Sequence, residues 1–261
     1  TYPGALFTYQ FAAMFLDTEC LGHDLHPSTS LDLFANTECA IRTSREWSID
    51  KAQTQITYSE DRWGPTANED ADDLYRAHGA TPVAIPDPPQ ENGTVAPYAA
   101  VCSVPFLPGE AIASIRHYLR ETDAWRHRFG LADALHFDIA APGVLVDNGQ
   151  LVRKHGEWYH HVGFGIDIAP ILLLVENART NLVPRLFHSN RHITDALARL
   201  YGKGDADRNG RVDLSDYADF DGCFTDPATL PDAGCESFDF DCDADIDLID
   251  FGFLQSVFQR L

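Results

Sequence analysis

The fold is best predicted from the stretch Gly163-Phe-Gly-Ile-Asp-Ile-Ala-Pro-Ile-Leu-Leu-Leu-Val-Glu-Asn-Ala-Arg-Thr180. Its early glycines suit a turn, and Pro170 suits the first position of a helix. Ile171–Val175 is an unbroken apolar run, so we expect this helix to be buried on all sides. Asp167 lies just before the expected start. A carboxylate there is either a simple helix cap or a functional group that a partner stabilises.

Other motifs precede this stretch in a fixed order: Leu6–Phe11, Asn36–Arg45, Trp63–Asn68, Gly93–Ala100 and Phe129–Ala134. Together with Gly-Ile-Asp-Ile-Ala-Pro and Val-Glu-Asn-Ala-Arg, they resemble the glucoamylase-like domain of a glycoside hydrolase family that includes endo-β-1,2-glucanases. The resemblance spans roughly residues 1–200 and only the C-terminal part of that domain. It implies part of an all-α (α/α)6 toroid, in which inner helix ends and loops form a sugar-binding cleft.

The resemblance also implies a mechanism, which is inverting acid/base hydrolysis of a β-glucan. Asp167 matches the family's Gly-Ile-Asp carboxylate and is expected to be the general base. The family's general-acid Glu aligns to a part of the domain before Thr1, so this chain alone is expected to lack the acid. If the acid lies within the chain instead, the candidates are Asp70, Asp133 and Glu157.

Aromatic and short polar side chains are the usual groups that hold sugar rings and hydroxyls. The candidates for substrate binding are Trp63, Asn68, Asp70, His78, Trp158 and Tyr159. For each tryptophan, plain core packing is an equal alternative.

The chain departs from the family pattern at Pro65, Asn92 and Ile168-Ala169. These departures are compatible with a different glucan as the substrate. They also keep open an alternative function, a non-catalytic carbohydrate-binding or anchoring protein on a degenerate hydrolase fold.

Charge divides the chain into two predicted domains, residues 1–202 and 203–261. Of the formal net charge of −21, the second domain carries −11, from 15 acidic and 4 basic residues. Such acidity argues against nucleic acid and anionic membranes as partners, and no apolar stretch is long enough to span a membrane. We expect a processed, secreted or periplasmic protein that acts on a polysaccharide or oligosaccharide.

The acidic domain contains two similar loops, 34 residues apart, with oxygen side chains at the spacing of a calcium-binding EF-hand loop. The predicted ligands are Asp205, Asp207, Asn209, Arg211 (through its carbonyl), Asp213 and Asp216, and then Asp239, Asp241, Asp243, Asp245, Asp247 and Asp250. Gly210 occupies the sixth position of the first loop, and Ala244 replaces it in the second. The alternative is a disordered acidic tail, but such tails lack the apolar stripes that follow both loops.

Both loops end in Asp, as in dockerin modules, which the domain resembles more than sensor EF-hands. We therefore expect two bound Ca²⁺ ions and consider a cohesin-like protein as the partner. The positions that would meet that partner, Leu214-Ser215 and Leu248-Ile249, are unusually apolar, so internal packing is the alternative.

The six cysteines form no Cys-x-x-Cys metal or redox motif. A disulfide is predicted between Cys223 and Cys235, whereas Cys20, Cys39 and Cys102 suit buried free thiols. An Asn-Gly turn within residues 144–152 predicts a β-hairpin.

Overall fold

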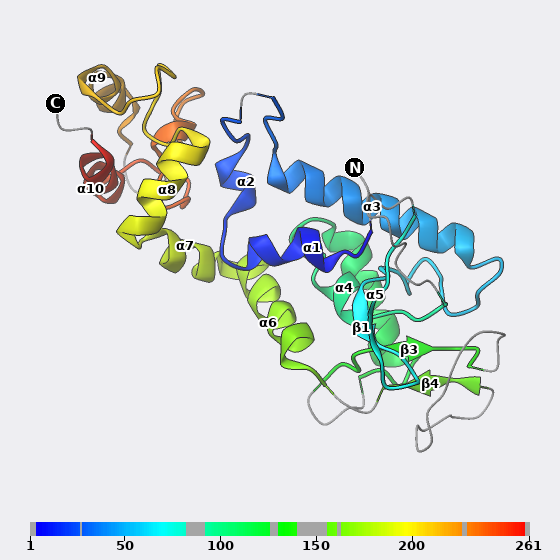
Figure 1. Ribbon diagram of the computed structural model, residues 1–261. Helices are drawn as coiled ribbons and strands as arrows, with labels where there is room; N and C mark the ends of the chain where they lie inside the picture. The colour runs from blue at the N-terminus through cyan, green and yellow to red at the C-terminus, as the bar shows by residue number, and fades with distance from the viewer. Residues whose placement is uncertain are drawn as a thin grey trace. The chain divides into compact units, whose positions relative to one another are not determined.

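The computed structural model describes residues 4–26, 28–81, 92–125, 130–139, 156–160, 163–225 and 229–258. The chain forms two compact units (Figure 1). Unit 1 comprises Thr1–Met14 and Ala35–Thr180, and unit 2 comprises Phe15–Phe34 and Asn181–Leu261. The predicted domain boundary at residue 202 lies inside unit 2, where a helix before that boundary packs against the last helix of the chain.

Helices dominate unit 1. They are α1 (Phe7–Gln10), the 3-10 helix η1 (Phe11–Met14), α3 (Leu33–Lys51), α4 (Pro97–Val101), α5 (Pro108–Arg120) and α6 (Gly165–Thr180). All five residues of α4 are buried, and α4 packs against both α5 and α6. A proline begins α4 and another begins α5, because the fixed φ of proline suits a first helical turn.

Two short antiparallel ribbons lie beside these helices. One pairs β1 (Ala67–Glu69) with β2 (Tyr75–Ala77), and the other pairs β3 (Leu135–His136) with β4 (Trp158–Tyr159). The prediction of an all-α fold is therefore right about the dominant helices but missed these ribbons. The hairpin predicted at residues 144–152 lies outside the described residues.

Helix α6 differs from its prediction in two ways. It begins at Gly165, so Asp167 lies within its first turn and Pro170 lies inside the helix. Only Asp167, Pro170 and Leu174 are buried, at the spacing of one helix face, while Leu172 is 67% exposed. The expectation of burial on all sides is wrong for this chain, because the helix packs on one face only.

Unit 2 is built around a duplicated loop–helix element. Its helices are α2 (Thr18–Leu21), α7 (Leu182–His188), α8 (Arg191–Tyr201), α9 (Leu214–Cys223), the 3-10 helix η3 (Glu236–Phe238) and α10 (Leu248–Val257). The core contains Val212, Phe220, Cys235, Phe238, Phe240, Ile246 and Leu254. Because both loops contribute apolar side chains to this single core, the acidic segment is folded in the structure.

Unit 2 contains two disulfide bonds. The predicted bond between Cys223 and Cys235 is confirmed. The second joins Cys20 to Cys242 over a sequence separation of 222 residues, so the expectation that Cys20 is a free thiol is wrong. The pairing of cysteines so far apart depends on the tertiary fold, which spacing does not specify. Cys39 is free but exposed, and Cys102 is free and buried.

Candidate active site and acidic loops

Asp167 faces a second carboxyl group, that of Asp133, which immediately precedes Ala134 and strand β3. Asp167 is 2% exposed and Asp133 is 3% exposed, and each carboxyl group influences the pKa of the other. The Oδ2 atom of Asp133 also accepts a hydrogen bond from the backbone N–H of Glu69, at 2.9 Å. Of the predicted candidates, Asp167 is thus the one that meets another buried acid.

Neither oxygen of Asp167 nor Oδ1 of Asp133 has a hydrogen-bond partner among the described residues. The nearby hydroxyl of Tyr98 donates its proton to the carbonyl oxygen of Ala67, at 2.9 Å. Ionised carboxylates only accept hydrogen bonds. Because these buried oxygens have no described donor, the ionised form of each acid is costly.

The environments of the two acids shift the pKa values of both. Burial, reinforced by the influence of Asp167, raises the pKa of Asp133 to about 9. Burial also raises the pKa of Asp167, but the influence of Asp133 and Tyr98 opposes that rise. The N-terminal end of α6 further favours a negative charge on Asp167. Of the two acids, Asp167 is therefore the one whose ionised form has more support.

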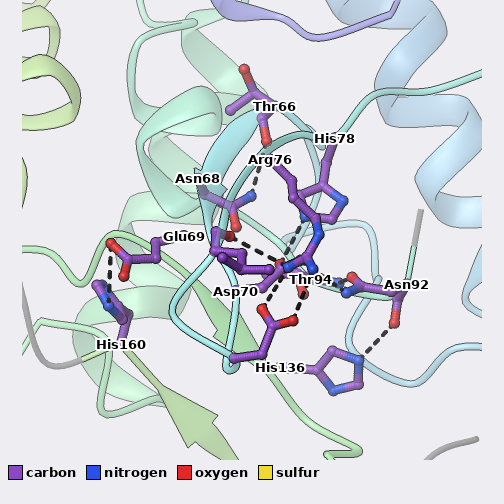
Figure 2. A network of polar contacts seen from close by, with 12 residues as sticks. Thr66, Asn68, Glu69, Asp70, Arg76, His78, Asn92, Thr94, His136 and His160 are labelled. Carbon is purple, nitrogen blue, oxygen red and sulfur yellow. Dashed lines mark hydrogen bonds and ion pairs between the residues drawn. The ribbon is translucent and has the colours of Figure 1, made fainter. Parts of the chain in front are cut away.

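His160 and Glu69 lie on the other side of Asp133. The imidazole Nδ1 of His160 is 3.8 Å from Asp133 Oδ2, and its Nε2 is 4.0 Å from Glu69 Oε2 (Figure 2). These separations exceed a direct hydrogen bond. Phe164 stacks on the His160 ring, with centroids 5.7 Å apart, and helps to fix its position.

A separate polar network surrounds Asp70, after strand β1 (Figure 2). Asp70 accepts from His78 Nε2 at 2.7 Å, from Arg76 Nη1 at 2.9 Å and from Asn92 Nδ2 at 3.2 Å. Arg76 also binds both oxygens of Asp72, which lowers the pKa of that carboxyl. Because protein donors already occupy both oxygens of Asp70, this network holds the turn of the β1–β2 ribbon.

The structure brings most of the predicted sugar-binding residues to the two ribbons and buries them. Asn68, Asp70 and His78 belong to or flank β1 and β2, whereas Trp158 and Tyr159 form β4. Trp158 packs in a cluster with Ala71, Ala134 and Ile139.

Trp63 and Trp158 are 0% exposed, so in this structure their rings are enclosed by protein. Tyr159 is 7% exposed. Contact of these residues with a sugar therefore stays a prediction.

Sequence reasoning gave Asp133 only as one of three substitutes for the missing general acid, and it did not propose Glu69 or His160 as site residues. The signal was weak because the three residues are distant in sequence. Pairing of β3 with β4 places Asp133 and His160 at the same end of one ribbon, where the His160 N–H bonds the Ala134 carbonyl oxygen. A hydrogen bond from the Glu69 backbone then joins β1 to Asp133.

The two acidic loops of unit 2 repeat one another in detail. In the first, Asp205 accepts from the N–H groups of Asn209 and Gly210. In the second, Asp239 accepts from those of Asp243 and Ala244.

The last acid of each loop also accepts equivalent backbone hydrogen bonds. Asp216 accepts from Ala206 and Asp213, and Asp250 accepts from Phe240 and Asp247. The sequence repeat is therefore also a structural repeat.

Each loop gathers carboxylate oxygens within 4.8 Å of one another, in the sets Asp205, Asp207 and Asp216; Asp239, Asp241 and Asp250; and Asp245, Asp247 and Asp250. Oδ1 of Asp241 is buried and receives no hydrogen bond from the described residues. Burial and the charge of Asp250 raise the pKa of Asp241 to about 7. Gathered oxygens, a buried acceptor and repelling charges together fit a divalent cation such as Ca²⁺.

Comparisons with known proteins agree with this geometry for the first part of the chain. Residues 1–191 match the model of the family described as “Putative glucoamylase”. An exo beta-1,2-glucooligosaccharide sophorohydrolase (non-reducing end) of Parabacteroides distasonis is 26% identical over 189 residues, which cover 71% of this chain and 23% of that protein.

Solved structures of similar proteins also align with this chain. A glucoamylase-family protein from Bacteroides uniformis aligns with a TM-score of 0.57 and 26% identity, over 73% of this chain and 39% of that one. A β-1,2-glucanase from Parabacteroides distasonis aligns with a TM-score of 0.61 and 24% identity, over 76% of this chain and 24% of that one. The chain thus spans well under half the length of each of these relatives.

Proposed function

Because the chain belongs to the family described as “Putative glucoamylase”, we propose that it forms the base-bearing part of a β-glucan hydrolase. The preferred substrate is β-1,2-glucan, since two similar proteins act on β-1,2-linked glucose by their names. The observation that carries this proposal is Asp167, a carboxylate buried in the first turn of α6 with no hydrogen-bond partner among the described residues for either oxygen.

In this proposal Asp167 is the general base of an inverting hydrolysis. A base of this kind removes a proton from the attacking water as that water reaches the sugar, which typically speeds the reaction by about 10²- to 10⁴-fold. The general acid is proposed to come from a part of the family domain that this chain does not contain. The chain then supplies the base and its support but not the complete pair.

The test uses the full-length protein and a panel of β-1,2-, β-1,3- and β-1,4-glucans. We expect fastest release of sugar from β-1,2-glucan, with the anomeric configuration of the new reducing end inverted. Hydrolysis of another linkage alone would keep the enzyme class and change the substrate. Binding without hydrolysis of any glucan would favour the alternative, a non-catalytic carbohydrate-binding or anchoring protein.

We propose a second role for unit 2, calcium binding by its two acidic loops. The repeated loop hydrogen bonds and the gathered carboxylates support it. Titration calorimetry of the full-length protein is expected to show uptake of two Ca²⁺ ions, and no uptake would end this proposal.

An attachment role is also supported, because the side chains predicted to meet a cohesin-like partner are exposed. Leu214 is 69%, Leu248 73% and Ile249 53% exposed, so the alternative of internal packing does not describe this structure. Two disulfides suit the secreted or periplasmic location that we propose. No described helix combines the length and the hydropathy that a membrane span requires. Binding of a cohesin-like protein to the full-length chain, measured with and without calcium, tests this role.

A further inference from the structure

The Cys20–Cys242 disulfide ends inside the second acidic loop. Cys242 stands between Asp241 and Asp243, two of the predicted calcium ligands, and Cys20 lies in helix α2. We propose that the second loop reaches its full calcium affinity only when this bond has formed, so that the oxidation state of unit 2 sets how many Ca²⁺ ions it holds tightly. The proposal rests on the proposed calcium binding and adds a form of regulation to it.

Both loops adopt a left-handed backbone at positions four and six, but with different residues. In the first loop these are Arg208, with φ +58°, and Gly210, with φ +86°. In the second they are Cys242, with φ +59°, and Ala244, with φ +70°. Glycine adopts this conformation readily, whereas other residues are strained in it. The second loop therefore holds two strained residues where the first holds one.

The hydrogen bonds that close each turn differ in the same direction. In the first loop, Asp205 accepts from the N–H groups of positions five and six at 3.0 and 2.8 Å. In the second, Asp239 accepts from the equivalent N–H groups at 3.2 Å each. The backbone of the second loop is therefore less tightly closed around its position-one acid, and a restraint from outside the loop has more to contribute there.

The disulfide provides such a restraint at one of the two strained residues. It fixes Cys242 to Cys20, whose backbone N–H donates to the side chain of Asp17, the N-cap of α2, at 3.0 Å. The residue before Cys242 is Asp241, whose buried Oδ1 has no hydrogen-bond partner among the described residues. The bond thus holds the backbone beside a ligand oxygen that the described residues leave open. The rigidity of a calcium loop contributes to its affinity, so loss of the bond should weaken the second site.

Lys203 places a positive charge at this disulfide. It is 5% exposed, and its Nζ lies 3.3 Å from Cys20 Sγ. Nζ also donates to the carbonyl oxygens of Glu236 and Asp239, at 3.0 and 2.9 Å. These three acceptors match the three N–H donors of an ammonium group. An adjacent ammonium stabilises a thiolate, so Cys20 is the cysteine that we expect to react first.

The bond forms by exchange with a disulfide oxidant, which is the chemistry of an oxidising compartment. The Cys20 thiolate attacks one sulfur of the oxidant, and the oxidant's other sulfur leaves as a thiolate. The Cys242 thiolate then attacks Cys20 Sγ and releases the first sulfur. The two cysteines lose two protons and two electrons, and the oxidant takes them up as a dithiol. In a secreted protein, the second calcium site would accordingly be completed during export.

The test measures the two loops separately in the full-length protein. Asp205→Ala disables the first loop and leaves the second as the reporter, whereas Asp239→Ala leaves the first. Each variant is combined with Cys20→Ser and Cys242→Ser, and calcium dissociation constants are measured by titration calorimetry. Loss of the bond should weaken calcium binding about tenfold in the Asp205→Ala protein, the effect of one or two strained residues. It should leave binding unchanged in the Asp239→Ala protein.

Two controls show whether the effect belongs to the second loop. Ala244→Gly removes a strained residue, so it should restore part of the calcium affinity that the Asp205→Ala protein loses with the bond. Replacement of Cys223 and Cys235 by serine removes a disulfide whose ends lie outside both loops, and it should leave the affinity of the second loop near its original value.

The outcomes separate this inference from calcium binding itself. Uptake of two ions by the wild type, with a second site that is unaffected by loss of the Cys20–Cys242 bond, would overturn the inference and leave calcium binding standing. Equal weakening of both loops would show that the bond supports unit 2 as a whole, and it would overturn the inference as well. No calcium uptake by the oxidised wild type would reject calcium binding and the inference with it.

Discussion

The two units surround their buried carboxylates differently. In unit 1, neither oxygen of Asp167 nor Oδ1 of Asp133 has a hydrogen-bond partner among the described residues. In unit 2, the position-one acids Asp205 and Asp239 each accept hydrogen bonds from two backbone N–H groups. A buried charge is costly unless it is paired or neutralised. The supply of donors therefore distinguishes the candidate active site from the acidic loops.

The largest expected effect is on catalysis, in unit 1. Asp167→Asn keeps the size of the side chain and its capping ability but removes the base, so kcat of the full-length protein should fall by about 10²- to 10⁴-fold. The measurement is initial rates on β-1,2-glucan, together with circular dichroism to verify the fold. Glu176→Gln, on the same helix, is the matched control. Turnover within a few-fold of wild type in Asp167→Asn would remove Asp167 from the mechanism.

The disulfides of unit 2 should show the next largest effect. In the chain-entropy description, a cross-link over a longer loop removes more entropy from the unfolded chain. Loss of the Cys20–Cys242 bond, which spans 222 residues, should cost up to about 5 kcal/mol, and loss of the Cys223–Cys235 bond about 3 kcal/mol. Denaturant unfolding of the two double-serine variants measures both. Equal losses would mean that loop length does not determine their contributions.

Calcium should stabilise unit 2. At a free concentration 100-fold above the dissociation constant, each ion stabilises the folded state by about 2.7 kcal/mol. Thermal unfolding with calcium and with a chelator measures this. Asp205→Ala should weaken binding more than Asp239→Ala, because Gly210 favours the tighter loop. Equal loss of calcium affinity in the two variants would refute only that ranking. A thermal unfolding midpoint that does not change with calcium would refute calcium binding by the loops.

The smallest expected effect compares the sixth positions of the two loops. Gly210 has φ +86° and Ala244 has φ +70°, a region in which a side chain is strained by roughly 1 kcal/mol. A Cβ atom added at Gly210 meets no atom within 4 Å, so its cost is conformational only. Ala244→Gly should stabilise by about 1 kcal/mol and Gly210→Ala should destabilise by a similar amount. Changes of the same sign in both variants would contradict this account.

Much of unit 2 could be predicted from the sequence, because the patterns that specify its loops and helices each lie within a short stretch of residues. Loop spacing located both acidic loops and the helices that follow them, and the loop at Cys223–Cys235 located a disulfide. Ala244, which replaces the glycine of the first loop, has a positive φ, a conformation in which a side chain is strained. Only the bond between Cys20 and Cys242 depends on distant parts of the chain, and that bond was not predicted.

Unit 1 was less predictable, because its candidate site is assembled from distant segments. The helical motif identified Asp167, but nothing near it in sequence indicates Asp133, Glu69 or His160. These groups meet through two short ribbons whose strands have two or three residues, too few for an alternating pattern to be recognised. The sequence also did not predict that one side of α6 is exposed. In a helix that is apolar on all sides, the residue pattern does not indicate which face packs against the rest of the chain.

The central claim is a contrast between the two units: we propose that Asp167 of unit 1 is a reacting base and that the loop acids of unit 2 hold calcium. The most direct test applies two measurements to Asp167→Asn and Asp205→Ala of the full-length protein, which are hydrolysis of β-1,2-glucan and calcium uptake by titration calorimetry. We predict that Asp167→Asn loses hydrolysis and keeps calcium uptake, whereas Asp205→Ala weakens calcium uptake and keeps hydrolysis. A variant that loses both properties with its fold intact, or two variants that lose neither, would contradict the account.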